Sequence, residues 1–429
     1  MIFLRIHVVR SGESIYSIAR QYRVSPEKII SDNELDDPSN LVVGQTIVIL
    51  EGTRTHTVTP GESLYSIANS YRISLNAILQ ANPQITNPAA IYVGQTITIP
   101  PVTINFGNIE VNGYAFPNIN REVLNKTLPH LTYLSIFSYQ VKPDGSLTAI
   151  QDEPLIQAAR EARVAPLMVI TNISEEGGFS SDIAHEIFTN ETAQTNLINN
   201  VTNTLRNKNY YGLDIDFEYI YPYDRESYNN FLRRISSTLR PLGYTITTAV
   251  APKTFAEQPG LLYQGHDYPV HGALADHVII MTYEWGYTYS PPQAVAPINE
   301  VRRVLNYAVT AIPRQKIFMG IPNYGYNWTL PFRPNTAATT ISNTGAVDLA
   351  RRVGAAIQYD TVAQSPFFRY YDENGRQHEV WFEDARSILA KFTLANEFRV
   401  GGLSYWTIGR YFPQNWLILE EVFDVRKVL

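Results

Sequence analysis

Acidic residues recur at every second position in residues 211–220, which read YGLDIDFEYI. These residues are Asp214, Asp216 and Glu218, with an apolar residue before each. Successive side chains of a β-strand point to opposite faces, so the three carboxyl groups share one face. Carboxyl groups in a buried row cannot all ionise, so they share protons and their pKa values separate. The pattern predicts a general acid that stays protonated near neutral pH, beside a charged or proton-sharing neighbour.

The elements that position this row are strands and helices that alternate after residue 101. Helical stretches such as PLIQAAREAR and YNNFLRRISSTLRPLG separate eight apolar runs. The eight predicted strands are residues 111–116, 131–139, 165–172, 211–219, 244–252, 276–285, 316–326 and 400–409. This alternation predicts an α/β fold, a (β/α)8 barrel or TIM barrel.

The barrel gives the acidic row a direction. Alternate strand residues point into the barrel, so we expect the carboxyl groups inside and Leu213, Ile215 and Phe217 against the helices. At about 3.3 Å per residue, Glu218 lies about 13 Å from Asp214, at the C-terminal mouth where barrel active sites form. The alternative is an open strand with a wet acidic face, which is typical of antiparallel sheets rather than a βα series.

An insertion separates the last two predicted strands. Its segment AAIQYDTVAQSPFFRYYDENGRQHEVWFEDA predicts strands around a DENG turn, and ARSILAKFTLANEF predicts the helix that returns to the barrel. We expect this small β-rich insertion to stand on the rim and shape a cleft.

Two copies of another pattern precede the barrel. HVVRSGESIYSIARQYRVSPEKII begins at His7, and HTVTPGESLYSIANSYRISLNAIL begins at His56. The copies close with LVVGQTIVIL and IYVGQTITIP. Each copy predicts strand, helix, helix, strand, with Ser14 capping the first helix and a second helix near residues 26–33. The residues PPVTIN (100–105) predict a short linker.

These copies resemble LysM modules, which bind glycans that contain N-acetylglucosamine. The resemblance divides the chain into module 1 (4–50), module 2 (54–100) and the barrel (101–429). The family's groove maps to two loops of each copy. The expected glycan-binding residues are Gly12, Ser14, Ile15 and Leu41 in module 1, and Gly61, Ser63, Leu64 and Ile91 in module 2. Two sites on one chain favour binding to a repeating polymer. The alternative is a duplicated structural cap.

The acidic row resembles the family 18 glycoside hydrolase signature D-G-x-D-x-D-x-E, and the resemblance covers most of residues 105–429. Gly212 and the three inner acids match, whereas Tyr211 stands in place of the first Asp. A second departure is VITN at 169–172, where many chitinases have S-x-G-G.

The resemblance implies a mechanism in which the substrate's own 2-acetamido oxygen attacks, giving an oxazolinium ion. Glu218 would then be the acid and base, Asp216 would orient the acetamide, and Asp214 would share a proton with Asp216. MTYEWGY (281–287) is similar to the family's M-x-Y-D motif, with Glu284 in place of Asp. Tyr283 would donate a hydrogen bond to the acetamide oxygen.

Aromatic and amide side chains near the predicted strand ends could bind the sugar. The expected substrate-binding residues are Tyr114, Trp285, Asn323, Tyr324 and Trp406, with Trp328 and Trp381 as further candidates. Each of them alone could instead belong to barrel packing.

Composition excludes several other classes. A net charge of −6 without a basic run argues against nucleic acid and anionic membranes as partners. The chain has no cysteine, and its histidines lack metal-site spacing, so we expect neither a metal nor a cofactor. Arg5 interrupts the only apolar run of the N-terminus, which argues against a secretory signal, and no apolar run reaches membrane-spanning length. We expect a soluble monomer.

Together the two resemblances predict a retaining, substrate-assisted N-acetylglucosaminidase of peptidoglycan. The arrangement is similar to spore cortex-lytic N-acetylglucosaminidases, which implies action on cortex or its fragments during germination and a location at the spore or cell wall. One alternative is a chitinase or an endoglycosidase of N-glycans. Another is a non-catalytic lectin, although such proteins usually lose the acid that Glu218 provides here.

Overall fold

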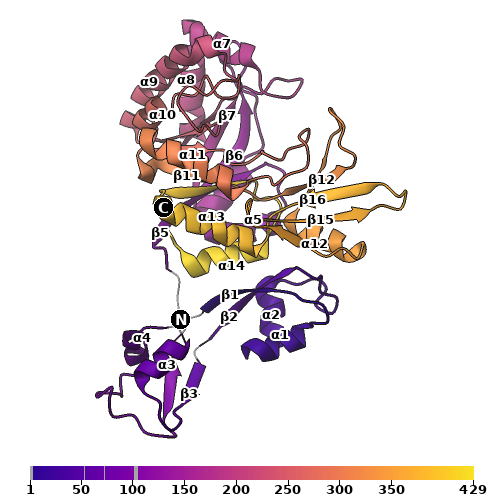
Figure 1. Cartoon of the computed structure of the whole chain (residues 1–429). Coiled ribbons are helices and arrows are strands. Elements are labelled where there is room, and N and C mark those ends of the chain that lie inside the picture. The colour runs from indigo at the N-terminus through magenta and orange to yellow at the C-terminus, as the bar shows by residue number, and fades with distance from the viewer. Residues whose placement is uncertain (1–2, 53, 72, 101–104) are drawn as a thin grey trace. The chain divides into compact units, whose positions relative to one another are not determined.

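The computed structural model describes residues 3–52, 54–71, 73–100 and 105–429 (Figure 1). It divides into two compact units, one of residues 1–107 with 413–423 and the other of residues 108–412 with 424–429. Residues 101–104 of the predicted linker lie outside the described residues.

Each of the two N-terminal copies has the predicted order of strand, helix, helix and strand. Module 1 consists of β1 (Phe3–Val8), α1 (Ile15–Tyr22), α2 (Pro26–Asn33) and β2 (Thr46–Glu51). Module 2 consists of β3 (Arg54–Thr57), α3 (Leu64–Tyr71), α4 (Leu75–Ala81) and β4 (Thr96–Ile99). The two strands of each module pair antiparallel. As predicted, Ser14 caps α1, and its side chain accepts a hydrogen bond from the Ser17 backbone N–H.

Partly buried polar side chains make the same contacts in both modules. In module 1, His7 contacts Glu13 at 2.8 Å and Tyr22 at 3.0 Å, which joins the first strand to the following loop and helix. His56 makes the same two contacts with Glu62 and Tyr71 in module 2. These contacts fix the loop that begins the predicted groove in each copy.

A buried asparagine lies at the C-terminal end of the second helix of each module. The Asn33 side chain donates to the Val48 carbonyl at 2.7 Å and accepts from the Val48 N–H at 2.7 Å. Asn82 does the same with Thr98. The same unit includes α14 (Pro413–Val422), where Gln414 donates to Asn33 Oδ1 at 2.9 Å.

In the described residues, eight parallel strands close the predicted barrel, because the last strand pairs with the first. They are β5 (Asn108–Ala115), β6 (Tyr133–Gln140), β7 (Ala165–Thr171), β8 (Gly212–Asp216), β9 (Thr245–Val250), β10 (His277–Ile280), β11 (Ile317–Pro322) and β17 (Gly402–Trp406). A short strand, β18 (Asp424–Val425), also pairs with β5. Inward side chains such as Leu167, Val169 and Ile279 fill part of the interior.

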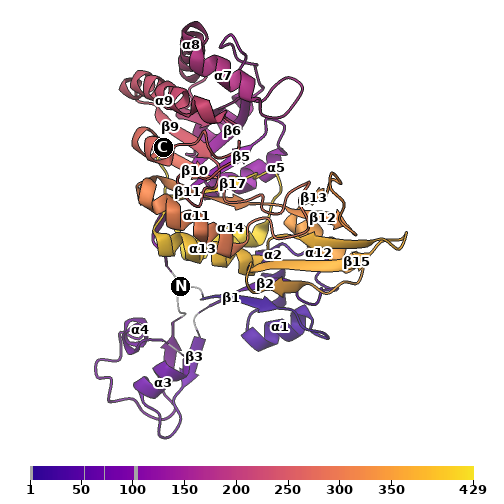
Figure 2. The same ribbon diagram turned by 45° about the horizontal axis from the view of Figure 1, so that its top comes forward.

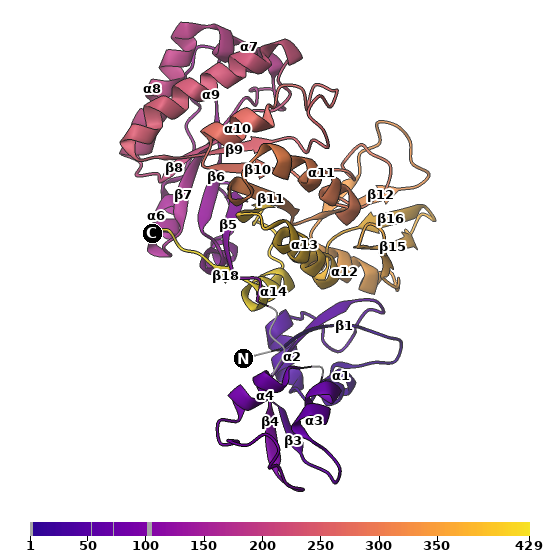
Figure 3. The ribbon, with the colours of Figure 1, turned by 60° about the vertical axis from the view of Figure 1, so that its left-hand side comes forward.

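Helices surround the barrel strands (Figure 3). They are α5 (Arg121–Thr127), α6 (Glu153–Glu161), α7 (Ser181–Thr189), α8 (Glu191–Asn207), α9 (Arg225–Leu239), α10 (Tyr268–Leu274), α11 (Ile298–Ala311) and α13 (Ala385–Phe398). The Phe217 ring lies 5.8 Å from Phe188 on α7 and 6.1 Å from Phe231 on α9. Phe217 therefore faces the helices, which leaves the opposite face of β8 to the carboxyl groups.

The insertion projects from one side of the barrel as a five-stranded antiparallel sheet (Figure 2). Its elements are β12 (Gly325–Thr329), β13 (Thr339–Ile341), α12 (Asn343–Arg352), β14 (Gln358–Asp360), β15 (Ser365–Tyr371) and β16 (Gln377–Trp381). The DENG turn joins β15 to β16 as predicted, whereas α12 was not predicted. The predicted strand 316–326 is wrong in extent, because the chain leaves the barrel after Pro322 and enters the insertion sheet.

Several other barrel strands are shorter than predicted, among them β17, which covers only residues 402–406 of the predicted 400–409, and β9, which covers 245–250 of 244–252. Strand β8 ends at Asp216 rather than at 219, and β10 ends at Ile280 rather than at 285. Glu218, Tyr283 and Glu284 therefore stand on the loops that follow these strands, where backbone direction is not set by the ladder.

Candidate active site

The deep part of the acidic row lies inside the barrel. Asp214 is 0% exposed and Asp216 is 4% exposed, both on β8. Ser135 Oγ on β6 donates to Asp214 Oδ2 at 2.8 Å. No cation forms an ion pair with either aspartate among the salt bridges of the described residues.

Burial separates the pKa values of the row. Burial raises the pKa of Asp214 to about 6, although the hydrogen bonds that it accepts oppose the rise. Burial and the neighbouring charges of Glu218 and Asp214 raise the pKa of Asp216 well above its ordinary value. Burial, and then the charge of Glu284, raise the pKa of Glu218 to about 8. At neutral pH Glu218 is therefore mainly a protonated acid.

Glu218 and Asp216 line a cavity of about 610 Å³ at the carboxyl end of the barrel strands. Aromatic rings make up much of its wall: Tyr114, Phe137, Phe179, Tyr219, Tyr263, Trp285, Tyr287 and Trp406. A concave site with a few polar groups among aromatic faces is typical of a site that binds a sugar or another small ligand.

The motif after strand β10 reaches the same cavity. Tyr283 and Glu284 line it, and the Tyr283 side chain is 8% exposed. Burial, with the nearby charge of Asp216, raises the pKa of Tyr283 well above its ordinary value, so its hydroxyl remains a hydrogen-bond donor. Tyr324 and Tyr326 donate to the Glu284 carboxylate, the second at 3.0 Å. These two tyrosines hold the negative charge that faces Glu218.

Three of the five expected substrate-binding residues line the cavity: Tyr114, Trp285 and Trp406. The Trp406 ring lies 5.3 Å from Tyr114 and 4.8 Å from Phe137, edge to face, so it is fixed by packing.

Asn323 and Tyr324 do not line the cavity. Asn323 is 3% exposed, and its amide donates to the backbone carbonyls of Thr407 and Arg410. The Tyr324 hydroxyl donates to the Glu284 carboxylate instead of facing the cavity. The other two tryptophans also belong to packing, because Trp328 donates to the Ser290 carbonyl and Trp381 stacks on Phe367.

The sequence prediction missed several cavity residues. Phe179, Tyr219, Leu262, Tyr263 and Tyr287 come from loops between barrel strands and helices. The signal for the four aromatic residues is that loops after barrel strands form the mouth of the barrel, and Leu262 follows the same rule of position.

Tyr211, which replaces the acid of the signature, lies at the other end of the row. Its ring centroid is 6.2 Å from that of Tyr133, and it packs against the apolar cluster of the barrel interior. The Tyr211 N–H donates to the Pro166 carbonyl at 2.8 Å. An aromatic ring thus occupies the base of the barrel beneath Asp214.

The expected glycan-binding residues of the modules differ in exposure. Gly12 and Gly61 have φ angles of 82° and 86°, which favour glycine, and no atom would meet an added Cβ. Ser63 repeats the capping contact of Ser14. Ile15 and Leu64 are buried in their module cores, and Leu41 and Ile91 pack against those cores. Only the backbone of Ile15 and Leu64 is therefore offered to a glycan.

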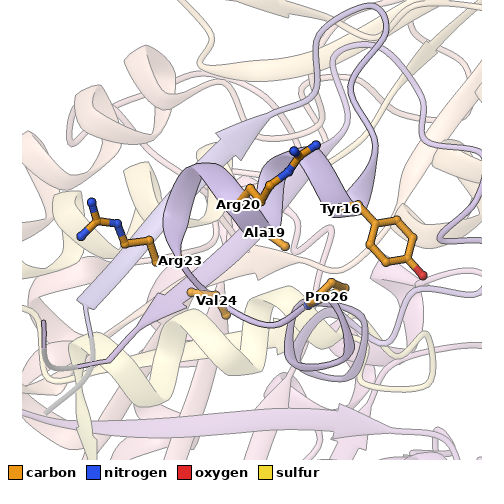
Figure 4. Close-up of a pocket in the computed structure, with 6 residues that line it drawn as sticks. All are labelled: Tyr16, Ala19, Arg20, Arg23, Val24 and Pro26. Atoms are coloured by element: carbon orange, nitrogen blue, oxygen red, sulfur yellow. The ribbon is translucent and has the colours of Figure 1, made fainter.

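Module 1 also has a shallow hollow on another face, between α1 and the start of α2 (Figure 4). Its lining residues are Tyr16, Ala19, Arg20, Arg23, Val24 and Pro26. Tyr16 is 70% exposed. Arg20 is replaced by Asn69 at the matching position of module 2.

Two structural features of the described residues bear on other functions. Within residues 3–52, 54–71, 73–100 and 105–429, no group of three or more His, Asp or Glu could hold a metal ion. In the same residues, no helix is both long and apolar enough to cross a membrane.

Comparisons with known proteins agree with this geometry. The family model of glycosyl hydrolases family 18 matches residues 111–410, and the LysM domain model matches residues 7–50 and 56–100. The chain is 44% identical over 431 residues to a cortical fragment-lytic enzyme of Bacillus subtilis, and 42% identical over 432 residues to one of Bacillus anthracis. Each alignment covers 99% of both chains.

A solved structure supports the same relationship. The spore cortex-lytic enzyme SleL of Bacillus megaterium QM B1551 superimposes with a TM-score of 0.88 at 42% identity, covering 100% of both chains. By sequence and by structure, the chain belongs to the glycosyl hydrolases of family 18 and carries two LysM domains.

Proposed function

We propose that this glycosidase is a retaining, substrate-assisted N-acetylglucosaminidase that cleaves β-linked N-acetylglucosamine bonds in peptidoglycan of the spore cortex or in its fragments. The observation that carries the proposal is Glu218, whose pKa is raised to about 8 in a cavity that it shares with Asp216 and Tyr283. A carboxylic acid that keeps its proton at neutral pH can protonate a glycosidic oxygen.

In the first step, Glu218 donates its proton to the glycosidic oxygen while the bond from that oxygen to the anomeric carbon breaks. The acetamido oxygen of the same sugar forms a bond to the anomeric carbon, giving an oxazolinium ion. Asp216 accepts a hydrogen bond from the acetamide N–H and stabilises its positive charge. Tyr283 donates to the acetamido oxygen and holds it in line for attack.

In the second step, a water molecule attacks the anomeric carbon from the side that the leaving group has left. The bond from carbon to the acetamido oxygen breaks, and the Glu218 carboxylate takes a proton from the water. Two displacements at one carbon retain its configuration, and Glu218 regains the proton that it gave. Trp406 and Tyr114 form the apolar wall against which the sugar ring packs.

The substrate class rests on the relatives and on the modules. Both the LysM domains and the family 18 region favour polymers that contain N-acetylglucosamine, such as peptidoglycan. Relatives that match along the whole chain are called cortical fragment-lytic enzymes, which supports a role at the spore cortex during germination. Two modules on one chain raise the local concentration of the enzyme on an insoluble polymer.

The experiment that tests the proposal is mass analysis of the products from digested cortex peptidoglycan, for the wild type and for Glu218→Gln. We expect the wild type to release fragments with N-acetylglucosamine at the new reducing end and the variant to release none. Equal product release by both proteins would show that the assigned acid is wrong. Faster cleavage of chitin oligomers than of muramic-δ-lactam fragments would favour a chitinase instead.

A further inference from the structure

Among the residues that the structure describes, no strand pairs with the backbone around Glu218. The ladder between β7 and β8 ends with Thr171 opposite Asp216, and that between β8 and β9 ends with Ile215 opposite Thr248. Tyr219 has a φ of 54°, a left-handed conformation that is uncommon for a residue with a side chain. The peptide groups that carry Glu218 therefore need partners other than the sheet.

Asn172 provides these partners on both sides of Glu218. Its side chain is 0% exposed, and its Oδ1 accepts from the Glu218 N–H at 3.0 Å. Its Nδ2 donates to the Glu218 carbonyl at 2.8 Å and to the Ser180 carbonyl at 2.9 Å. An asparagine amide has both a donor and an acceptor, so it replaces the neighbouring strand that β8 lacks beyond Asp216. A glycine at 172 would make none of these bonds.

Two further side chains hold the neighbouring carbonyls. Ser181, the first residue of α7, donates to the Tyr219 carbonyl. His266 Nε2 lies 2.9 Å from the Phe217 carbonyl, while its Nδ1 accepts from the Ala251 N–H at 3.0 Å. The Nε2 atom therefore carries the hydrogen in the neutral ring, and burial lowers the pKa of His266 to about 4, which keeps the ring neutral.

We propose that Asn172 is a positioning residue for Glu218, which it places in the cavity by bonding to both peptide groups of that residue. This inference rests on the proposed role of Glu218 as the acid. Asn172 does not touch the substrate. Asn172 fixes the Cα position of Glu218. That position decides where the carboxyl group meets the glycosidic oxygen and how far water is excluded from the carboxyl group.

Asn172→Ala tests the inference on the full chain. Misplacement of a catalytic group by about 1 Å costs on the order of 100-fold in rate, so we expect kcat to fall about 10- to 100-fold. KM should stay within about twofold, because the sugar walls are unchanged. A less confined carboxyl group gains water, so the alkaline limb of the pH profile should move to lower pH by about one unit. A residue with only a structural role would leave that limb in place.

Asn229→Ala is the matched control. Asn229 is 1% exposed on α9, where its amide donates to Glu226 and Asp267. Its replacement by alanine therefore removes a comparable buried amide away from the cavity. We expect a similar loss of thermal stability in both variants, with kcat and the alkaline limb changed only in Asn172→Ala. If Asn172→Ala does not fold, Ser181→Ala is measured in its place. We expect a smaller fall in kcat and a shift of the alkaline limb to lower pH, as for Asn172→Ala.

Glu218→Gln is measured beside them to separate two failures. If Glu218→Gln keeps wild-type activity, the proposed acid is wrong, whatever the Asn172 variant does. If Glu218→Gln is inactive and a folded Asn172→Ala keeps both the wild-type kcat and the wild-type alkaline limb, the positioning role alone is overturned. If the Ser181 variant is the one measured, an unchanged alkaline limb would likewise overturn the positioning role.

Discussion

Glu218→Gln should make the barrel more stable as well as inactive, and the gain should grow with pH. The pKa of Glu218 is about 8 in the folded protein against an ordinary value of 4.5. Below 4.5 the side chain is protonated in both states. Between 4.5 and 8 the folded protein keeps a proton that the unfolded chain has lost, so the free energy of unfolding falls as pH rises.

The size of the effect follows from the same two values. One proton contributes about 1.4 kcal/mol for each pH unit, and pH 7 lies about 2.5 units above the ordinary pKa. Keeping Glu218 protonated in the fold therefore costs about 3 kcal/mol at pH 7. Glutamine resembles the protonated acid in shape and carries no proton to lose, so the variant should recover most of this free energy.

Denaturant unfolding of both proteins at several pH values measures the prediction. The difference in unfolding free energy should be close to zero near pH 4 and rise to about 3 kcal/mol near pH 7. Glu161→Gln on the exposed face of α6 is the control, with a difference that stays small at every pH. A difference for Glu218→Gln that does not change between these pH values would refute the assignment of the raised pKa.

Three further predictions test other parts of the chain. Glu284→Gln removes the second cause of the raised Glu218 pKa, so the alkaline limb of kcat should move to lower pH by about one unit, and an unmoved limb would contradict the coupling. Lys391→Ala leaves the Glu383 carboxylate buried without its partner at 2.8 Å, which should lower the unfolding free energy by about 3–5 kcal/mol in denaturant titrations. Gly61→Val strains a φ of 86° in module 2, so pelleting assays should show weaker binding to insoluble peptidoglycan, with cleavage of short soluble fragments unchanged.

Strand periodicity predicted the part of the site that the ladder holds. Asp214 and Asp216 lie on β8, and their inward orientation follows from the two-residue repeat together with the barrel. Phe217 still follows the repeat, because it packs against α7 and α9. Glu218 reaches the cavity too, but its position depends on side-chain bonds from Asn172 that no repeat in the sequence indicates.

Two of the predicted substrate-binding residues lie outside the cavity lining, at the point where the chain changes direction. Asn323 and Tyr324 follow β11, and residues at that place in a barrel normally face the mouth. Here the chain turns directly into β12 of the insertion, so the Asn323 amide is used on backbone carbonyls near 407–410. Sequence patterns predicted that an insertion exists but not where its first strand begins. Only residues 323 and 324 separate that strand from the barrel strand, so the two read as one apolar run.

Asp214 and Glu218 lie at different depths in the acidic row. The order of their pKa values keeps the proton on the acid at the mouth. Asp214 is the deepest of the three acids and has a pKa of about 6, against about 8 for Glu218, so it loses its proton before Glu218 does. Burial, and then the charges of Glu218 and Asp214, raise the pKa of Asp216, while burial and Glu284 raise the pKa of Glu218. Near pH 7 Asp214 therefore carries a negative charge at the base of the row, and Glu218 keeps its proton at the cavity. An acid at the mouth needs this order, because a row that ionised from the mouth inward would give its proton to solvent before a substrate arrived.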